Sequence, residues 1–127
     1  MLIEINFESD IPIYEQLKRQ LIEGIASGDL KNGDSLPSVR HMAEDIGINL
    51  HTVNKAYNEL RLEGYLNIDR RKGAVINSYI PKNSKELNER LEDELKYLIA
   101  RAHLNGADER DFLRLCSDIF KKYNKSL

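Results

Sequence analysis

The run from Leu36 to Ile76 constrains the fold more than any other part of the chain. Apolar residues recur at spacings of three and four on both sides of Gly47, which predicts two short helices. After Gly64, two brief apolar runs flank a basic tip, which predicts a β-hairpin. A helix, a glycine turn, a second helix and a hairpin, in this order, are typical of a winged helix-turn-helix. We therefore expect a mainly α fold with a small β-wing, a unit suited to holding DNA.

The ends of these elements are marked by single residues. Pro37 disfavours helical geometry at Leu36, and Ser38 can cap the helix that follows. Gly47 permits the positive φ of a tight turn. Asn49 is the predicted N-cap of the next helix, which Gly64 ends.

The segments before and after this run predict further elements. Near the start, Leu2, Ile3, Ile5 and Phe7 alternate imperfectly with polar residues, which predicts a short strand. Asp10 offers a cap and Pro12 a first helical turn, so we expect a helix running to about Ser27.

Charge argues against simple bulk attraction to DNA. The formal net charge of the chain is -2. Residues 1–80 carry nine Lys+Arg and twelve Asp+Glu, giving -3, while residues 81–127 carry ten and nine, giving +1. Binding must therefore depend on where the basic groups lie, and a dimer would double the patch at the hairpin tip.

Several motifs in this run resemble the GntR family of transcriptional regulators, in the same order and spacing. They are LPS followed by Arg40, then IGIN, TVNKAYNEL, EGYL and RRKGAVI. The resemblance covers about the first three-fifths of the chain. It implies a winged helix-turn-helix in which residues 49 to 54 lie at or near DNA.

The candidate DNA-binding residues come from the start of the helix after Pro37, the outer face of the next helix, and the hairpin tip. They are Ser38, Arg40, Asn49, Leu50, His51, Thr52, Asn54, Lys55, Asn58, Arg70, Arg71, Lys72 and Gly73. A solvated polar face would explain part of this pattern, and Arg40 could instead pair with Glu44 at i+4. Leu50 is predicted to point outward, where it could contact a thymine methyl group.

The segment from Asn49 to Asn54 departs from the commonest family pattern. That pattern, Ser-Arg-Thr-Thr-Val-Arg, has two arginines that this chain lacks. Arginine is the usual partner of guanine, whereas Asn54 suits adenine. The Asn49 start resembles the YtrA-like branch of the family. That resemblance implies a repressor of its own operon and of a neighbouring transporter, often of the ATP-binding-cassette type.

The last part of the chain predicts a separate segment. Pro81 marks the boundary, so the expected domains are residues 1–80 for DNA binding and 81–127 for dimerisation. Two helices broken at Asn105-Gly106 carry apolar stripes that cannot fully cover each other. The candidate dimer-forming residues are Leu87, Leu91, Leu95, Leu98, Phe112, Leu115, Ile119 and Phe120. A symmetric homodimer on an operator with two-fold symmetry is therefore expected, with any effector bound at the dimer interface.

Other functional classes receive little support. The three histidines are dispersed, the lone Cys116 lies on an apolar stripe, and neither glycine-rich phosphate loop nor nucleophile elbow is present. We therefore predict no enzymatic activity, no metal and no cofactor. With neither a signal peptide nor a membrane span, the expected location is the cytoplasm. The main alternative is a winged helix that binds another protein, which the acidic balance would suit.

Overall fold

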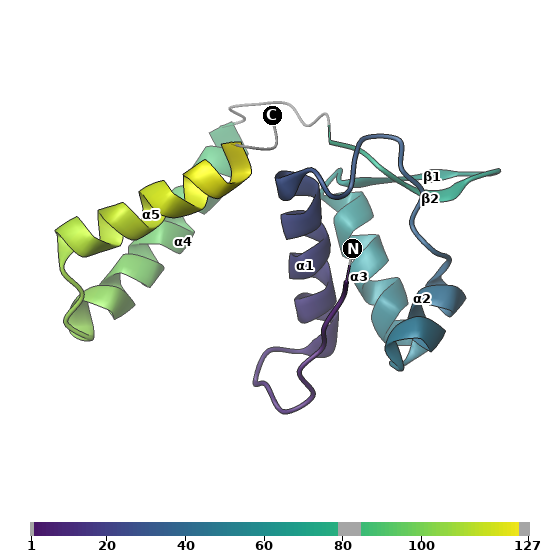
Figure 1. Cartoon of the computed structure of the whole chain (residues 1–127), viewed down its shortest axis with the longest axis horizontal. Coiled ribbons are helices and arrows are strands. Elements are labelled where there is room, and N and C mark those ends of the chain that lie inside the picture. Colours follow the sequence, from purple (N-terminus) through teal and green to yellow (C-terminus); the bar gives the residue numbers. More distant parts are fainter. Residues whose placement is uncertain (1, 79–84, 125–127) are drawn as a thin grey trace. The chain divides into compact units, whose positions relative to one another are not determined.

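The computed structural model describes residues 2–78 and 85–124, which form two compact units. The first unit contains the helices α1 (Ile13–Ser27), α2 (Val39–Ile46) and α3 (Leu50–Leu62), followed by the strands β1 (Leu66–Asp69) and β2 (Gly73–Ile76). The second contains α4 (Lys85–Leu104) and α5 (Glu109–Asn124). Figure 1 labels all seven elements. The predicted mainly α fold with a small two-stranded wing is confirmed.

All three helices and both strands of the first unit contribute to one apolar core. Leu17 and Leu21 from α1 are fully buried, as are Val53 and Leu60 from α3. The remaining members of the core are Leu36, Met42, Ala43, Ala56, Tyr57, Leu66, Ala74 and Ile76. Because α3 buries one face against this core, its opposite face is left to solvent.

The predicted caps fix the helix-turn-helix. The Ser38 side chain accepts a hydrogen bond from the His41 N–H (3.1 Å), and the Asn49 side chain accepts one from the His51 N–H (2.7 Å). Gly47 has φ 77°, the left-handed conformation that ends α2 and turns the chain toward α3. These three predictions from the sequence are confirmed.

The predicted strand near the start of the chain is wrong. Residues 2–6 run alongside α1 without pairing to a strand, and their polar backbone groups bond to two glutamine side chains instead. Gln20 exchanges two hydrogen bonds with the backbone of Glu4 (2.9 and 2.6 Å), and Gln16 exchanges two with Asn6 (both 2.9 Å). The carboxamides thus take the place of a neighbouring strand, while Ile3 and Ile5 pack on the core.

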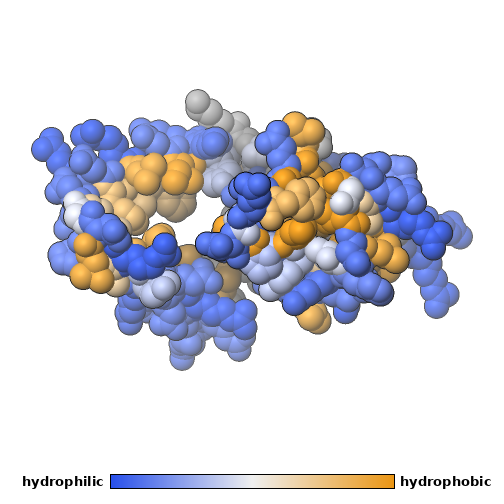
Figure 2. All heavy atoms as spheres, turned by 90° about the horizontal axis from the view of Figure 1, so that it is seen from below, coloured by the Kyte–Doolittle hydropathy of each residue, from blue (hydrophilic) through white to orange (hydrophobic). Residues whose placement is uncertain are grey.

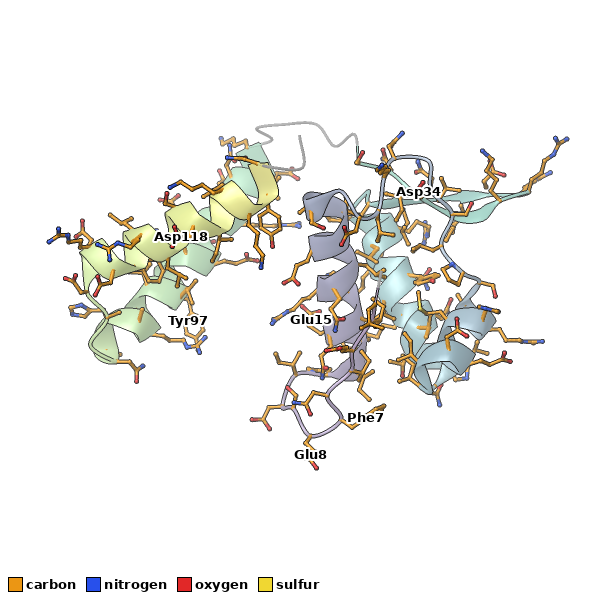
Figure 3. The ribbon with its side chains drawn as sticks, viewed as in Figure 1. Phe7, Glu8, Glu15, Asp34, Tyr97 and Asp118 are labelled. Carbon is orange, nitrogen blue, oxygen red and sulfur yellow. The ribbon has the colours of Figure 1, made fainter. Side chains whose placement is uncertain are left out.

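The start of α1 also differs from expectation. Pro12 is the residue that precedes the helix, and no side chain caps it, so Asp10 does not act as the predicted N-cap. Figure 3 shows Phe7 and Glu8 in the loop that leads into this end of α1.

A further segment pairs with the wing, which the sequence did not predict. Beyond the pairing of β1 with β2, the segment from Gly33 to Leu36 runs along the other side of β2. Gly33 and Leu36 donate to the carbonyls of Ile76 and Ala74 (2.9 and 2.8 Å), and the Ile76 N–H donates to Asp34 O (2.8 Å). The wing is therefore joined to the start of α2 through backbone hydrogen bonds.

The second unit is a helical hairpin without a buried core of its own. The turn at Gly106 separates α4 from α5, and the Asp108 carboxylate accepts from the Asp111 N–H (3.4 Å) at the start of α5. Neither helix has a fully buried residue. Apolar side chains consequently appear on the surface of this unit in Figure 2. Pro81 and its neighbours lie outside the described residues, within which no helix is long and apolar enough to cross a membrane.

Candidate nucleic-acid interface

The first turn of α3 presents most of the predicted base-contacting residues to solvent. Leu50 is 42% exposed, which confirms that it points outward, and His51 and Asn54 are exposed beside it. Asn49 is exposed but uses its side-chain oxygen for the cap, and Thr52 is only half-buried. One turn further along, Asn58 is also exposed. The arrangement offers hydrogen-bonding groups and one apolar side chain to whatever approaches this end of the helix.

Lys55 lies apart from that group. Its ammonium nitrogen sits 4.0 Å from the centre of the Tyr14 ring on α1, a cation–π contact. Tyr14 itself is half-buried in the first turn of α1. Lys55 is exposed like Asn54 and Asn58, but its ammonium group is already engaged by an aromatic ring.

The start of α2 is positioned by a residue whose polar role the sequence did not reveal. Tyr57 is nearly buried, and its hydroxyl donates to the Pro37 carbonyl (2.8 Å). Burial raises the pKa of the Tyr57 phenol far above its usual value, so the hydroxyl remains a donor. The apolar spacing along α3 placed Tyr57 inward but gave no sign of this bond, which ties α3 to the cap of α2.

Arg40 does not form the alternative ion pair with Glu44. Within residues 2–78 and 85–124 no ion pair involves Arg40, and the i,i+4 pair on α2 joins His41 to Asp45 (3.4 Å) instead. Arg40 is exposed two residues after Ser38. Its guanidinium is therefore free to meet an external anion.

The tip of the wing is organised by Asp69. Its carboxylate accepts hydrogen bonds from the Arg71 and Lys72 N–H groups (2.7 and 3.0 Å), and Gly73 follows with φ 78°. These two backbone hydrogen bonds lower the pKa of Asp69. Arg70, Arg71 and Lys72 are all exposed, and nitrogen-tipped side chains project from the outer end of the hairpin in Figure 3. The sequence predicted the basic tip but not the acidic residue that shapes it.

The basic side chains of the first unit are of two kinds, those paired within the protein and those left unpaired. The unpaired ones can meet DNA although residues 1–80 are acidic overall. Lys18 is engaged by Glu63 and Glu59 (2.9 and 3.2 Å), Arg19 by Glu15 (3.3 Å), and Lys55 by the Tyr14 ring. The other basic side chains make no ion pair with any residue that the structure describes: Lys31, Arg40, Arg61, Arg70, Arg71 and Lys72. The three engaged carboxylates are Glu15 on α1, Glu59 on α3 and Glu63, which follows the last residue of α3.

A metal site finds no support in the described part of the chain. No group of three or more His, Cys, Asp or Glu side chains there could hold an ion. His41 is paired with Asp45 and Cys116 is half-buried on α5.

A capped helix-turn-helix, a hairpin with a basic tip, and an exposed polar first turn on the second helix define a winged helix-turn-helix DNA-binding protein.

The chain belongs to the gntR family of bacterial regulatory proteins, whose model matches residues 13–76. It is 39% identical over 112 residues to the HTH-type transcriptional repressor YtrA of Bacillus subtilis (strain 168), covering 84% of this chain and 83% of that protein. It is also 39% identical to the solved YtrA from Sulfolobus acidocaldarius, a GntR-family transcription factor (TM-score 0.65, covering 82% of this chain and 99% of that one).

A further solved structure covers nearly the whole chain. A transcriptional antiterminator from Listeria monocytogenes EGD-e is 28% identical, with a TM-score of 0.87 over 97% of this chain and 92% of that one. The family membership confirms the predicted resemblance, and the chain is a DNA-binding transcriptional regulator. These findings favour this function over the alternative of a protein-interaction module.

Proposed function

We propose that this protein is a cytoplasmic, homodimeric repressor that binds an operator with two-fold symmetry and performs no catalysis. The repressor assignment is supported by the similarity to YtrA of Bacillus subtilis, which is named as a repressor. The dimer follows from how such proteins meet DNA, since two identical heads match two half-sites.

The first unit supplies the DNA contacts. In this proposal Leu50, His51 and Asn54 meet base edges in the major groove, because they occupy the exposed first turn of α3. Arg40 and the wing-tip residues contact phosphates on either side, since their charges are unpaired among the described residues. Ser38, Asn49 and Gly73 act chiefly through the backbone that they position.

The second unit supplies the dimer contacts. On α4 the leucines at positions 87, 91, 95 and 98 are 47%, 53%, 40% and 46% exposed, although they form one stripe at helical spacing. On α5, Leu115, Ile119 and Phe120 are exposed as well, and Phe112 is half-buried. An uncovered stripe of this length costs free energy in water, and a second copy of the hairpin would cover it. Residues 81–127 therefore serve as the dimerisation segment.

One observation carries the DNA-binding part of the proposal. Helix α3 is capped by Asn49 and joined by the Tyr57 hydroxyl to the Pro37 carbonyl just before α2, and yet its start exposes Leu50, His51 and Asn54. Rigid support beneath an exposed polar turn is what sequence recognition requires, because the groups must meet base edges in fixed positions.

A gel-shift experiment tests it. The intact protein should retard DNA from upstream of its own gene. Competitor DNA of mixed sequence should not displace this upstream DNA from the protein. Equal displacement by specific and mixed-sequence competitor would refute sequence-specific binding.

A further inference from the structure

Arg61 is a basic residue for which the proposed contacts leave no role. It lies in the last turn of α3 and is exposed. Among the residues that the structure describes, it makes no ion pair, no side-chain hydrogen bond and no contact with an aromatic ring. The Arg61 guanidinium is therefore available to an external anion.

Its acidic neighbours do not cancel that charge. Glu59 and Glu63 lie two residues before and after Arg61, and both carboxylates face the opposite flank of α3, where Lys18 binds them (3.2 and 2.9 Å). The Lys18 side chain is only 12% exposed, so this pairing is held between α1 and α3. The flank that carries Arg61 is left without a carboxylate partner.

The position of Arg61 on α3 matches the dimensions of DNA. Arg61 follows Asn54 by seven residues, which is about two helical turns, so both lie on one face and about 10 Å apart along the axis. The major groove is about 12 Å wide and about 8.5 Å deep. If the first turn of α3 meets base edges at the floor of the groove, a residue two turns back lies at its rim, where the phosphates are.

We propose that Arg61 contacts a DNA phosphate at the rim of the major groove, and so adds a sequence-independent contact to those of α2 and the wing. This inference rests on the proposed function, because it needs the first turn of α3 in the groove. A competing role is available: a cation in the last turn of a helix interacts favourably with the helix dipole. The two roles differ in what they change, since one acts on DNA binding and the other on folding.

The test compares the intact parent with R61Q and R61K, and uses R19Q as a control with the same change in charge. Arg19 is suited to this because it is paired with Glu15 on α1. The probe is a duplex that the parent selects from a random-sequence pool, and binding is measured across a range of salt concentrations. We expect R61Q to flatten the plot of log affinity against log salt by about two units of slope, because each chain of the proposed dimer loses one phosphate contact, while R61K and R19Q keep the parent slope.

Three outcomes would overturn the inference or its foundation, and they are distinguishable. If R61Q keeps the parent slope but lowers the unfolding midpoint, Arg61 serves the helix dipole and the inference is wrong. If R61Q and R19Q flatten the slope alike, the effect is one of overall charge, and the direct contact is again refuted. If the parent selects no sequence from the pool, the proposed function itself fails.

Discussion

Asn49 and Tyr57 show how single side chains determine what α3 can present. Asn49 satisfies a free N–H at the start of the helix, and the Tyr57 hydroxyl fixes the backbone just before α2. Neither needs to touch DNA to matter, because each holds the backbone on which the exposed residues stand. The division between supporting and contacting residues explains why the outer face of α3 can be polar without loosening the core.

Asn54 offers the sharpest test of base recognition. An asparagine side chain can donate to and accept from adenine at once, which is worth about 1–3 kcal/mol of discrimination. Asn54→Ala should therefore relax sequence preference at one symmetric pair of operator positions and leave non-specific affinity intact. Selection from a random pool measures this, with Asn124→Ala on α5 as a control. Unchanged stringency in Asn54→Ala would assign base recognition to other residues.

Lys18 should stabilise the fold in a pH-dependent way. Burial lowers the pKa of Lys18, but the hydrogen bonds and charges of Glu63 and Glu59 outweigh that effect and raise it above the ordinary 10.5. A raised folded-state pKa means that the stabilisation is complete below pH 10.5 and is lost as the pH rises through the folded-state value. Lys18→Met should lower the free energy of unfolding by about 1–2 kcal/mol at neutral pH, and by less above pH 10.5.

Urea denaturation at the two pH values checks the Lys18 prediction. Arg19→Met is the matched control, because the Arg19–Glu15 pair is exposed and should contribute less than about 1 kcal/mol. A Lys18→Met deficit that stays constant or grows with pH would contradict the assignment.

At the scale of elements, the sequence predicted what depends on local patterns and missed what depends on partners. The limits of α2 and α3 follow from Ser38, Gly47 and Asn49, whose effects are local, and all three were predictable. The pairing of Ser35 with Val75 joins segments far apart in the chain, so no local sequence pattern predicts it. Likewise, the alternation from Leu2 to Phe7 has the period of a strand, but Gln16 and Gln20 satisfy its backbone from a helix.

The wing should act as a sequence-independent element. Replacing Arg71 and Lys72 together with glutamine should weaken binding to all DNA sequences alike. It should also flatten the salt dependence by about one unit of slope for each phosphate that the wing no longer binds. Lys121 and Lys122 on α5 give a control with the same change in charge. A double variant that binds with the parent's salt slope would mean that the wing does not touch the DNA backbone.

At the scale of the whole molecule, the two units differ in how far they bury their own apolar residues. The first buries its apolar residues around one core, whereas α4 and α5 leave theirs uncovered. The sequence predicted the stripes on both helices, since their spacing is local. Which of the candidate residues meet DNA or a second copy depends on partners that a single chain does not contain.

A charge in the leucine stripe should separate the dimer. Leu95→Glu places a carboxylate among the exposed leucines of α4, and burying it against a second copy would cost several kcal/mol. Sedimentation should show a dimer for the parent and a monomer for Leu95→Glu. Leu104→Glu, at an 83% exposed position at the end of α4, should remain dimeric. A Leu95→Glu protein that stays dimeric would place the interface elsewhere.

Selection of DNA by the intact protein tests the central claim most directly. The parent is incubated with a random-sequence duplex pool, and bound DNA is recovered and sequenced over several rounds. A dimer with one reading head per chain should enrich a sequence with two-fold symmetry, whose half-sites lie about one helical turn of DNA apart or a multiple of it. No enrichment, or enrichment of a single asymmetric site, would contradict the claim that this chain is a dimeric, sequence-specific regulator.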